Sequence, residues 1–435
     1  MLIDKLKDRT ARVGVIGLGY VGLPLVHAVH DAGLTVIGFD IDRSKIDRIR
    51  RAEPYIRHLG QAFWQTLAAS DRFRPTSDEN DLRSADVLLL CVPTPLGRHR
   101  EPDLSFVTGS TEMVARILRP GQLVVLESTT YPGTTREVML PILERTGLRC
   151  GTDFFLAYSP EREDPGRTGL STSQIPKLVG GIDPPSADVA KAFYALVVEQ
   201  VHRVDSAEIA EASKLLENVY RAVNIALVNE LKVIFDRLGI DVWKVIEAAA
   251  TKPFGFQAFY PGPGLGGHCI PIDPFYLAWK ARETGYATKF IELAGEINAQ
   301  MPSYVVARVA EALNRAGKPV RHARILIVGI AYKRNVDDIR ESPAAEIIQQ
   351  LATHGAHVRY HDPHVPSFPQ MRRYQIDLAS VPLTSEELAA SDCVVIVTDH
   401  DAVDYELIGR CARVVVDTRN AMARVSAPKA EIVKA

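Results

Sequence analysis

The sequence predicts an α/β protein with two doubly wound parallel-sheet domains joined by a long central helix and a helical middle domain. Short β-rich runs alternate with helical stretches through the first 204 residues, as in parallel sheets whose faces are covered by helices. Between residues 207 and 238 there is neither Gly nor Pro, and apolar residues recur at helical spacing. Strand and helix signals alternate again after residue 317. We therefore expect domains at 1–204, 205–316 and 317–435.

The first domain opens with a strand at Arg12–Ile16, a glycine-rich turn and an apolar helix at Leu23–Ala32. A second strand follows at Thr35–Phe39. Later runs are continuously apolar, which is typical of strands buried on both faces. These runs are Val87–Val92, Leu123–Leu126 and Phe154–Tyr158.

The central helix is expected to begin at an Asp205 cap with Glu208 three residues on, and to end at Gly239. At 1.5 Å per residue it is roughly 48 Å long, enough for a spine that joins two domains. Its free face could carry a dimer interface. Gly317 and Pro319 mark a linker, and four further strands are expected at Arg324–Val328, His357–Tyr360, Cys393–Val397 and Arg413–Val416.

The composition excludes several classes of protein. The 435 residues include 51 basic and 53 acidic side chains, and this net charge of -2 gives no basic footprint for nucleic acid or an anionic membrane. No run of about 18 apolar residues could span a bilayer, and the polar segment MLIDKLKDRT is not typical of a signal peptide.

The cysteine pattern indicates neither a disulfide framework nor a zinc ribbon, because the five cysteines are widely spread and form no CxxC pair. They are Cys91, Cys150, Cys269, Cys393 and Cys411. We therefore expect a reduced, cytoplasmic protein without a metal site, in which one cysteine could be functional.

The sharpest motif is GLGYVG at 17–22, which directly follows a strand and opens a helix. Gly17 permits a tight turn, Gly19 lets a pyrophosphate approach the backbone, and Gly22 lets the helix pack on the strand. Asp40 ends the next strand, where a carboxylate binds a ribose and disfavours a 2′-phosphate. The pattern predicts a Rossmann-like NAD site. Lys45 could lie beside a 2′-phosphate or simply be solvated.

A second motif is the loop YPGPGLGGHC at 260–269, whose small residues can wrap a sugar or phosphate with backbone donors. Cys269 precedes an expected helix start at Asp273, and a thiol near a helix N-terminus can act as a thiolate nucleophile. Local sequence supports equally a small buried cysteine. Asp273 could equally be only a helix cap.

Lys214 and Asn218 lie four residues apart on the predicted helix and therefore share one face. An ammonium and an amide pointing the same way could stabilise an oxyanion. Without further context, local sequence favours a solvated face on which Glu211 and Glu217 are ion partners.

Charged and polar residues also follow the predicted strands, at the edge where open α/β sheets bind ligands. Glu161 could be a general base, with Arg162 and Glu163 beside it. Pro93 and Thr94 follow one apolar strand, and Thr129 follows another.

The first strand of the last domain is followed by a single glycine, Gly329, instead of a three-glycine motif. The sequence therefore does not predict a second dinucleotide site there. Basic residues cluster there instead, which indicates an anion-binding lobe. The alternative is a basic loop paired with Asp337, Asp338 and Glu341. The cluster consists of Tyr332, Lys333, Arg334 and Arg340.

Together these motifs resemble the UDP-glucose/GDP-mannose dehydrogenase family essentially from end to end. Within it the chain is most similar to bacterial UDP-N-acetylglucosamine 6-dehydrogenases. The segments that carry the resemblance are GLGYVGLPL (17–25), CVPTPL (91–96), ESTTYPGTT (127–135), YSPEREDPG (158–166), KLLENVYRAVNIALVNE (214–230), YPGPGLGGHCIPIDPFYL (260–277) and GIAYKRNVDDIRESP (329–343).

The resemblance implies catalytic roles. Cys269 matches the nucleophile, and Lys214 and Asn218 match the residues that stabilise the C6 oxygen. Asp273 and Thr129 match residues that lie near a water. Glu161 matches a carboxylate that acts as an acid or base. The implied NAD-binding residues are Gly17, Gly19, Tyr20, Val21, Gly22, Asp40, Lys45, Pro93, Thr94, Thr129 and Arg340. The implied substrate-binding residues are Glu161, Arg162, Glu163, Lys214, Asn218, Tyr260, Gly262, Gly264, Gly266, Gly267, Tyr332, Lys333 and Arg419.

The implied reaction oxidises the C6 alcohol of a UDP-sugar to a carboxylate with two NAD⁺, through a Cys269 thiohemiacetal and thioester. UDP-GlcNAc is the expected substrate, with UDP-ManNAc, UDP-GalNAc and UDP-glucose as alternatives. A two-electron hydroxyacid dehydrogenase and a catalytically silent binding protein are more distant alternatives. The product would serve surface polysaccharide synthesis, such as lipopolysaccharide O-antigen.

The family forms homodimers through the central helix. There a residue near 252–254 can reach the partner's substrate, but this chain has Lys252-Pro253-Phe254 where UDP-glucose members place an Arg.

Overall fold

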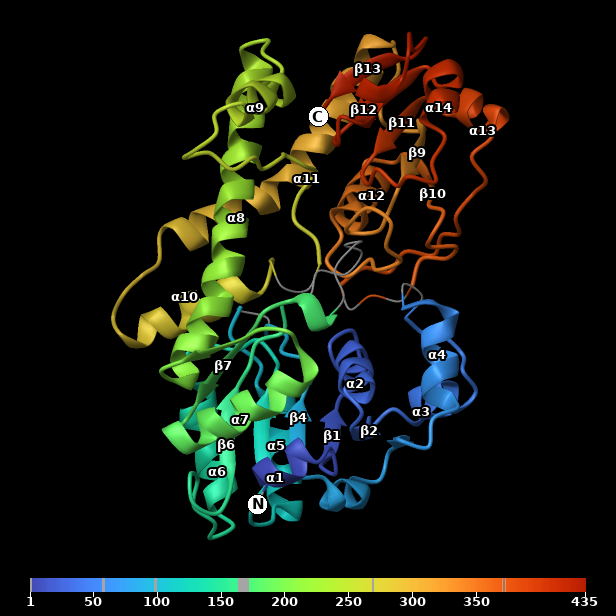
Figure 1. Cartoon of the computed structure of the whole chain (residues 1–435). Helices are drawn as coiled ribbons and strands as arrows, with labels where there is room; N and C mark the ends of the chain where they lie inside the picture. The colour runs from blue at the N-terminus through green and yellow to red at the C-terminus, as the bar shows by residue number, and fades with distance from the viewer. Residues whose placement is uncertain are drawn as a thin grey trace. The chain divides into compact units, whose positions relative to one another are not determined.

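The computed structural model folds into two compact units, and each is described by itself (Figure 1). The N-terminal unit comprises residues 1–217 and 275–287, and the C-terminal unit comprises residues 218–274 and 288–435. The division of the chain into domains at 1–204, 205–316 and 317–435 stays a prediction. The structure describes residues 2–56, 59–97, 100–162, 172–267, 270–369, 371 and 373–435.

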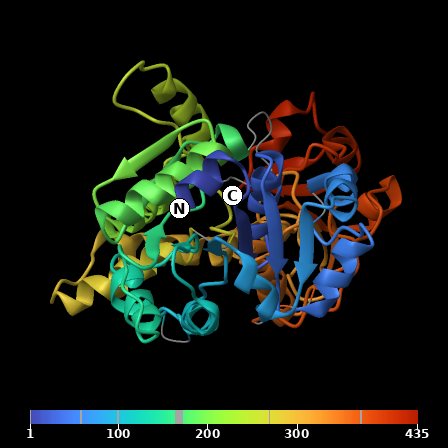
Figure 2. The ribbon, with the colours of Figure 1, turned by 60° about the horizontal axis from the view of Figure 1, so that its bottom comes forward.

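The N-terminal unit is built on an eight-stranded sheet with the order β3-β2-β1-β4-β5-β6-β7-β8. Figure 2 shows its first strands, in blue, side by side and pointing the same way. The strands are β1 Arg12–Ile16, β2 Thr35–Phe39, β3 Phe73–Thr76, β4 Val87–Leu90, β5 Leu123–Leu126, β6 Phe155–Tyr158, β7 Lys177–Gly181 and β8 Val201–Val204.

Two strands, β7 and β8, run against the direction of the other six and so depart from the predicted parallel sheet. β7 pairs antiparallel with β6, and β8 runs parallel to β7. An antiparallel neighbour must start at the edge where the preceding strand ends, so it needs no crossover helix. Lys177, the first residue of β7, therefore lies at the same edge as the carboxyl ends of β1 to β6.

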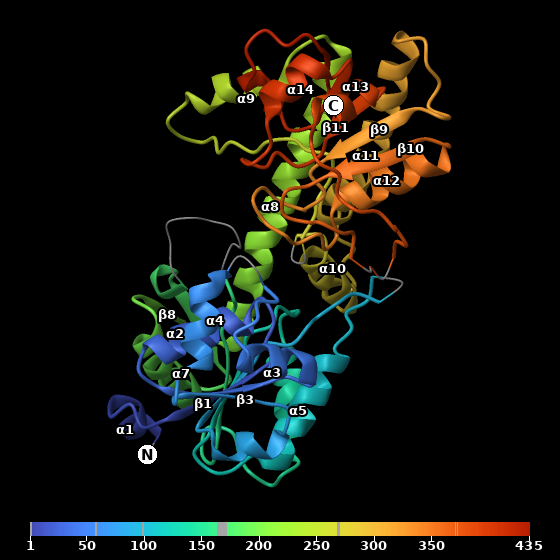
Figure 3. The same cartoon turned by 90° about the vertical axis from the view of Figure 1, so that its right-hand side faces the viewer.

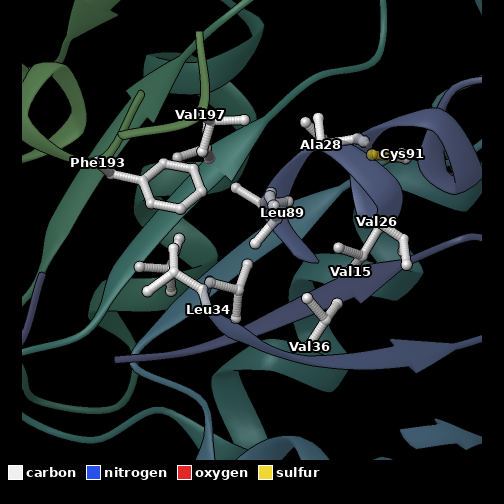
Figure 4. Close-up of a cluster of buried hydrophobic side chains, with 14 of the residues drawn as sticks. Val15, Val26, Ala28, Leu34, Val36, Leu89, Cys91, Phe193 and Val197 are labelled. Atoms are coloured by element: carbon white, nitrogen blue, oxygen red, sulfur yellow. The ribbon is translucent and has the colours of Figure 1, made fainter. Parts of the chain in front are cut away.

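Helices cover both faces of this sheet, as predicted for a doubly wound fold. One buried cluster joins the sheet to α1, α2 and α7, and Figure 4 shows Val26, Leu89 and Phe193 packed together in it. A second cluster joins the other face to α5 and α6. The helices are α1 Leu2–Lys7, α2 Gly22–Asp31, α3 Arg43–Arg50, α4 Gly60–Ala68, α5 Ser105–Ile117, α6 Leu140–Glu144 and α7 Pro184–Val197, with short turns at Glu79–Ser84, Thr135–Met139 and Thr172–Gln174. Helix α10 spans Asp273–Glu283, and its first two residues belong to the C-terminal unit.

The C-terminal unit contains a five-stranded, fully parallel sheet with the order β10-β9-β11-β12-β13. Helices α11 and α12 pack on one face, and α13 and α14 pack on the other (Figure 3). The elements are α9 Val242–Ala250, α11 Phe290–Arg315, β9 Arg324–Val328, α12 Pro343–Thr353, β10 His357–His361, α13 Ser385–Ala390, β11 Cys393–Ile396, α14 Tyr405–Cys411, β12 Val414–Asp417, a turn at Ala421–Arg424 and β13 Glu431–Lys434.

The long helix α8 spans Ala207–Arg237, as its lack of Gly and Pro predicts. Its cap differs from the prediction, because the hydroxyl that accepts from the Ile209 N–H belongs to Ser206 rather than to Asp205. Gly239 follows the helix with φ +69°, the left-handed conformation that glycine adopts readily after a helix end.

Candidate active site

The glycine-rich turn after β1 has the geometry of a phosphate cradle. Gly17 has φ +96°, and a Cβ on Gly22 would lie 1.8 Å from the Gly17 carbonyl oxygen, so both positions require glycine. A Cβ on Gly19 would meet nothing within 4 Å. This open space above the backbone at the start of α2 is where a pyrophosphate would approach the helix N-terminus. Tyr20 and Val21 lie in the same turn.

Asp40 lies directly after β2 and is 6% exposed. Its carboxylate accepts hydrogen bonds from the Leu18 N–H at 2.9 Å and the Asp42 N–H at 2.9 Å. The Lys45 ammonium also donates to it at 2.8 Å, so Lys45 is an ion partner of Asp40 rather than a solvated side chain. A negative group fixed beside the glycine turn suits a ribose diol, and the residues present fit NAD.

Lys214 and Asn218 are buried, with exposures of 8% and 3%. The solvated helix face that local sequence favoured is therefore wrong. The two glutamates expected as partners of Lys214 are engaged elsewhere. Glu211 accepts from the backbone of Gly133 and Thr135, and Glu217 pairs with Arg162 at 2.6 Å.

Asn218 and Asp273 come together although they are 55 residues apart in the sequence. The Asn218 amide donates to the Asp273 carboxylate at 2.7 Å, and both side chains are buried. Asp273 is the first residue of α10. The arrangement joins two of the predicted catalytic residues within the C-terminal unit.

Glu161 lies beyond the carboxyl end of β6, as predicted, and its side chain is 14% exposed. Lys177 lies 3.4 Å from one Glu161 oxygen and 2.6 Å from Glu127, the residue after β5. Sequence reasoning missed Lys177 and Glu127, since nothing local marks either charge as buried. Arg162 donates to the Pro176 carbonyl, besides its pairing with Glu217.

The other predicted residues of the N-terminal unit follow β4 and β5. Thr94 is buried, and the Ser128 hydroxyl ties the two loops by donating to the Val92 carbonyl at 2.7 Å. Thr129 is partly exposed. The neighbouring Thr130 is fully buried, and its hydroxyl has no hydrogen-bond partner among the residues that the structure describes. Pro93 lies in the first of these loops.

The glycine loop of the C-terminal unit is held against three predicted residues. A Cβ on Gly262 would lie 2.6 Å from an Arg419 guanidinium nitrogen. A Cβ on Gly266 would lie 2.6 Å from Tyr332, and the Gly267 N–H donates to the Arg340 carbonyl at 2.9 Å. The small residues are therefore needed for close approach. Gly264 has φ +135°, and Tyr260 stacks on Trp243 with ring centroids 5.6 Å apart.

The basic cluster of this unit is partly paired with acids. Arg340 binds Asp338 through several hydrogen bonds, one of them 2.6 Å long, and Arg334 binds Asp401. This pairing of Arg340 is the alternative that the sequence offered. The Arg419 Nε donates to the Val397 carbonyl at 2.9 Å. Lys333 lies in the same loop as Arg334.

Two predicted residues lie outside the described part of the chain: Glu163 and Cys269. The described residues nearest to Cys269 are Gly267 before it and Ile270 after it. The geometry of the thiol therefore stays a prediction, as do the roles of all the other site residues.

Comparison with known proteins places these features in one family. Residues 11–198 match the NAD binding domain of the UDP-glucose/GDP-mannose dehydrogenase family, residues 208–300 match its central domain, and residues 326–424 match its UDP binding domain. The chain belongs to the UDP-glucose/GDP-mannose dehydrogenase family. It is an NAD-dependent UDP-sugar dehydrogenase, an oxidoreductase.

Members of the family with different names are similarly close to this dehydrogenase. The UDP-N-acetyl-D-glucosamine 6-dehydrogenase of Pseudomonas aeruginosa is 35% identical over 94% of this chain and 96% of the relative. The NDP-N-acetyl-D-galactosaminuronic acid dehydrogenase of Ralstonia solanacearum is 34% identical over 94% and 95%. The structure of the UDP-D-ManNAc dehydrogenase from Pyrococcus horikoshii matches with a TM-score of 0.86 and 32% identity, over 97% of this chain and 98% of that chain. Among the described helices, none is long and apolar enough to cross a membrane.

Proposed function

We propose that this dehydrogenase oxidises C6 of a UDP-N-acetylhexosamine, UDP-GlcNAc first, to the uronic acid and consumes two NAD⁺ for each sugar. The names of its relatives support an acetamido sugar, since UDP-GlcNAc, UDP-ManNAc and N-acetylgalactosaminuronic acid enzymes all match over most of the chain. The 35% identity with the Pseudomonas aeruginosa UDP-GlcNAc enzyme is the reason to test that sugar first.

The buried hydrogen bond between Asn218 and Asp273 is the observation that carries the proposal. A simple alcohol dehydrogenase removes one hydride, whereas conversion of an alcohol to an acid also needs water to be added at the same carbon. Asn218 supplies an amide that can stabilise an oxyanion, and Asp273 supplies a carboxylate that can orient a water. Lys214, one turn earlier on α8, supplies a buried positive charge.

Each step assigns a task to a residue of this chain. Bound NAD⁺ accepts a hydride from C6 in each of the two oxidations. Glu161 takes the proton of the C6 hydroxyl, and the Cys269 thiolate adds to the aldehyde carbon to form a thiohemiacetal. Lys214 and Asn218 stabilise its oxyanion. After the second oxidation, water adds to the thioester and releases the acid with the restored thiol.

The diphosphate is assigned to the C-terminal unit. The guanidinium of Arg419 lies against Gly262 of the glycine loop there, and Tyr332 and Lys333 come from the loop after β9. Planar guanidinium groups bind phosphate oxygens with good geometry.

The proposed assembly is a homodimer formed along α8. This helix has an exposed apolar stripe at intervals of four and seven residues, the spacing by which one helix packs against another. The stripe consists of Ile209, Leu216, Tyr220, Leu227 and Ile234, and the exposed Leu238 directly follows the helix. Leu227→Glu places a charge in its middle, so sedimentation should show a smaller species than the wild type; an unchanged mass would remove the stripe from the interface. Lys252 and Phe254 are exposed, and their action across a dimer stays a prediction.

The deciding experiment measures NADH release with UDP-GlcNAc, UDP-GalNAc, UDP-ManNAc, UDP-glucose and GDP-mannose. The proposal expects UDP-GlcNAc to have the highest kcat/KM, with two NADH for each sugar. A preference for UDP-glucose would remove the acetamido assignment. One NADH for each sugar would indicate a two-electron dehydrogenase, and no NADH with any sugar would indicate a binding protein.

The covalent mechanism is tested by Cys269→Ser, with Cys411→Ser as the matched control. The serine variant should stall after the first oxidation or at an ester, whereas the control, in a partly exposed cysteine with no assigned task, should release two NADH for each sugar. Wild-type turnover by Cys269→Ser would contradict the covalent mechanism. The cytoplasmic location and the use of the product in surface polysaccharide synthesis stay predictions.

A further inference from the structure

Four polar side chains, three of them buried and the fourth partly buried, converge at the carboxyl edge of the eight-stranded sheet, and the proposed mechanism uses only the fourth, Glu161. Glu127 follows β5, Glu161 follows β6, Lys177 begins β7, and Tyr194 comes from α7. The Glu127 and Lys177 side chains are 0% and 7% exposed, and the Glu161 side chain is 14% exposed. Charges this deeply buried are costly unless they are paired.

Lys177 is the centre of this cluster. Its ammonium lies 2.6 Å from Glu127 Oε2 and 3.4 Å from Glu161 Oε2, so one positive charge serves two carboxylates. The Tyr194 hydroxyl donates to the other Glu127 oxygen, and the Tyr194 ring lies 5.4 Å from the ammonium. Glu127 and Tyr194 therefore both help to hold the lysine in place.

Electrostatics favours a charged lysine here. Burial alone would lower the pKa of Lys177, but the attraction of Glu127 and Glu161 outweighs burial and raises this pKa above its ordinary value. Burial raises the pKa of Glu127, and repulsion from Glu161 adds to that rise. Without the ammonium, two buried carboxylates would face each other, and one of them would take up a proton.

We propose that Lys177, held in place by Glu127 and Tyr194, is a positioning residue that orients the Glu161 carboxylate and keeps it ionised for proton abstraction from the substrate. Lys177 acts through Glu161 and does not itself contact the substrate. This inference rests on the role given to Glu161 in the proposed function.

A carboxylate base at this edge needs such support because, among the described groups, one buried ammonium lies beside both Glu127 and Glu161. The described charged and titratable groups that face Glu161 are Lys177 from β7, Glu127 after β5, Tyr194 from α7, Cys91 after β4 and the adjacent Arg162. Arg162 is itself paired with Glu217 on α8. Among the residues that the structure describes, Lys177 is therefore the buried cation in contact with both glutamates.

The main test is the pH profile of kcat for Lys177→Met, with the exposed Lys191→Met on α7 as the matched control. We expect kcat to fall roughly tenfold to a hundredfold, part of the effect of a general base, with KM for the UDP-sugar changed less than about threefold. The acidic limb should move up by about one pH unit, because Glu161 loses its opposite charge. Lys177→Arg, which keeps the positive charge, should return the acidic limb of the kcat profile to its wild-type pH. An unmoved limb in a folded Lys177→Met would contradict the proposal.

A double variant separates positioning from general stabilisation. If Lys177 acts through Glu161, adding Lys177→Met to Glu161→Gln should cause no further loss of kcat. Independent, multiplying losses would overturn the proposal. Where Lys177→Met does not fold, Glu127→Gln decides. It leaves the ammonium to Glu161 alone, so the acidic limb should move to lower pH, and an unmoved limb would again contradict the proposal.

The outcomes distinguish this inference from the proposed function. A wild-type enzyme that makes no NADH from any UDP-sugar would overturn the proposed function. A wild type that makes two NADH for each sugar, together with unmoved pH limbs in the variants, would overturn only the role of Lys177.

Discussion

Asn218 donates a 2.7 Å hydrogen bond to Asp273, and this contact joins the long helix α8 to the first residue of α10. Both groups are buried, so neither can exchange its partner for bulk water at little cost. The contact fixes the Asn218 amide and the Asp273 carboxylate relative to each other. A site whose hydrogen-bond groups are held before the substrate arrives loses less energy on reorganisation during the reaction.

Replacing Asn218 with Ala should therefore lower kcat by about a hundredfold or more, the usual effect of losing one oxyanion donor. It should also lower the free energy of unfolding by about 1–3 kcal/mol, because the buried Asp273 carboxylate loses the hydrogen bond from Asn218. Steady-state NADH release and thermal unfolding measure the two effects. Asn224→Ala is the control on the same helix, since Asn224 bonds to the carbonyl of Tyr220. Equal kcat values for the two variants would contradict the assignment.

Two glycines of the nucleotide turn should respond differently to alanine. Gly22→Ala should destabilise the fold, because its Cβ would lie 1.8 Å from the Gly17 carbonyl oxygen. Gly19→Ala should leave the thermal midpoint nearly unchanged and raise the Kd for NAD⁺, because its methyl group enters open space where the pyrophosphate approaches. Calorimetric unfolding and NAD⁺ titration check both expectations. Unchanged NAD⁺ affinity in Gly19→Ala would move the cofactor away from this turn.

The ion pair between Asp40 and Lys45 should control the choice between NAD⁺ and NADP⁺. Asp40→Asn removes the charge that repels a 2′-phosphate and releases Lys45 from its 2.8 Å contact. We expect the ratio of kcat/KM for NAD⁺ to that for NADP⁺ to fall about tenfold or more. Asp47→Asn, on the exposed face of α3, is the control and should keep the wild-type ratio. A wild-type ratio in Asp40→Asn would show that Asp40 does not face the ribose.

The buried carboxyl of Glu211 should make stability depend on pH. Burial raises the pKa of Glu211 to about 7, although Thr135 and Gly133 donate to it. Because the folded-state pKa lies above the unfolded value, the folded form binds this proton more tightly. The resulting stability is complete below about pH 4.5 and is lost as the pH rises through about 7. The loss is of the order of 3 kcal/mol.

Thermal unfolding between pH 5 and pH 8, at constant ionic strength, tests this expectation. Glu211→Gln should be less stable than the wild type at low pH, because the amide NH2 of the glutamine must face a backbone N–H donor of Gly133 or Thr135. The thermal midpoint of this variant should also vary less with pH. The exposed Glu230→Gln on the same helix should retain the wild-type pH dependence. Parallel curves for the wild type and Glu211→Gln would contradict the assignment.

The sequence predicts the buried strands best. Apolar runs define β1, β2, β5 and β9 to the residue, because a strand covered on both faces has no polar position to confuse the pattern. The short strand β8, with the sequence VHRV, was not predicted, since it is half polar and lies at the sheet edge. The cap of α8 moved by one residue to Ser206 because both Asp205 and Ser206 can cap a helix.

The candidate site was predictable where spacing along one element carries the information. Lys214 and Asn218 share a helix face by spacing alone, but their burial depends on distant segments, which is why local sequence favoured a solvated face. The role of Lys177 could not be predicted, because its partner Glu127 lies 50 residues earlier in the sequence. The two side chains meet only because β7 runs antiparallel to β6.

The direction in which β7 runs decides which of its residues lies beside Glu127 and Glu161. Because β7 is antiparallel to β6, this residue is the first one, Lys177. In a parallel arrangement the first residue of this five-residue strand would lie at the opposite rim of the sheet, about 13 Å away at 3.3 Å per residue. If the segment PKLVGG were grafted into a purely parallel nucleotide-binding sheet, its amino-acid sequence would be kept but the contact between its lysine and the glutamates would be lost. For protein engineering, the direction in which an edge strand runs is as much a part of this centre as the identity of its residues.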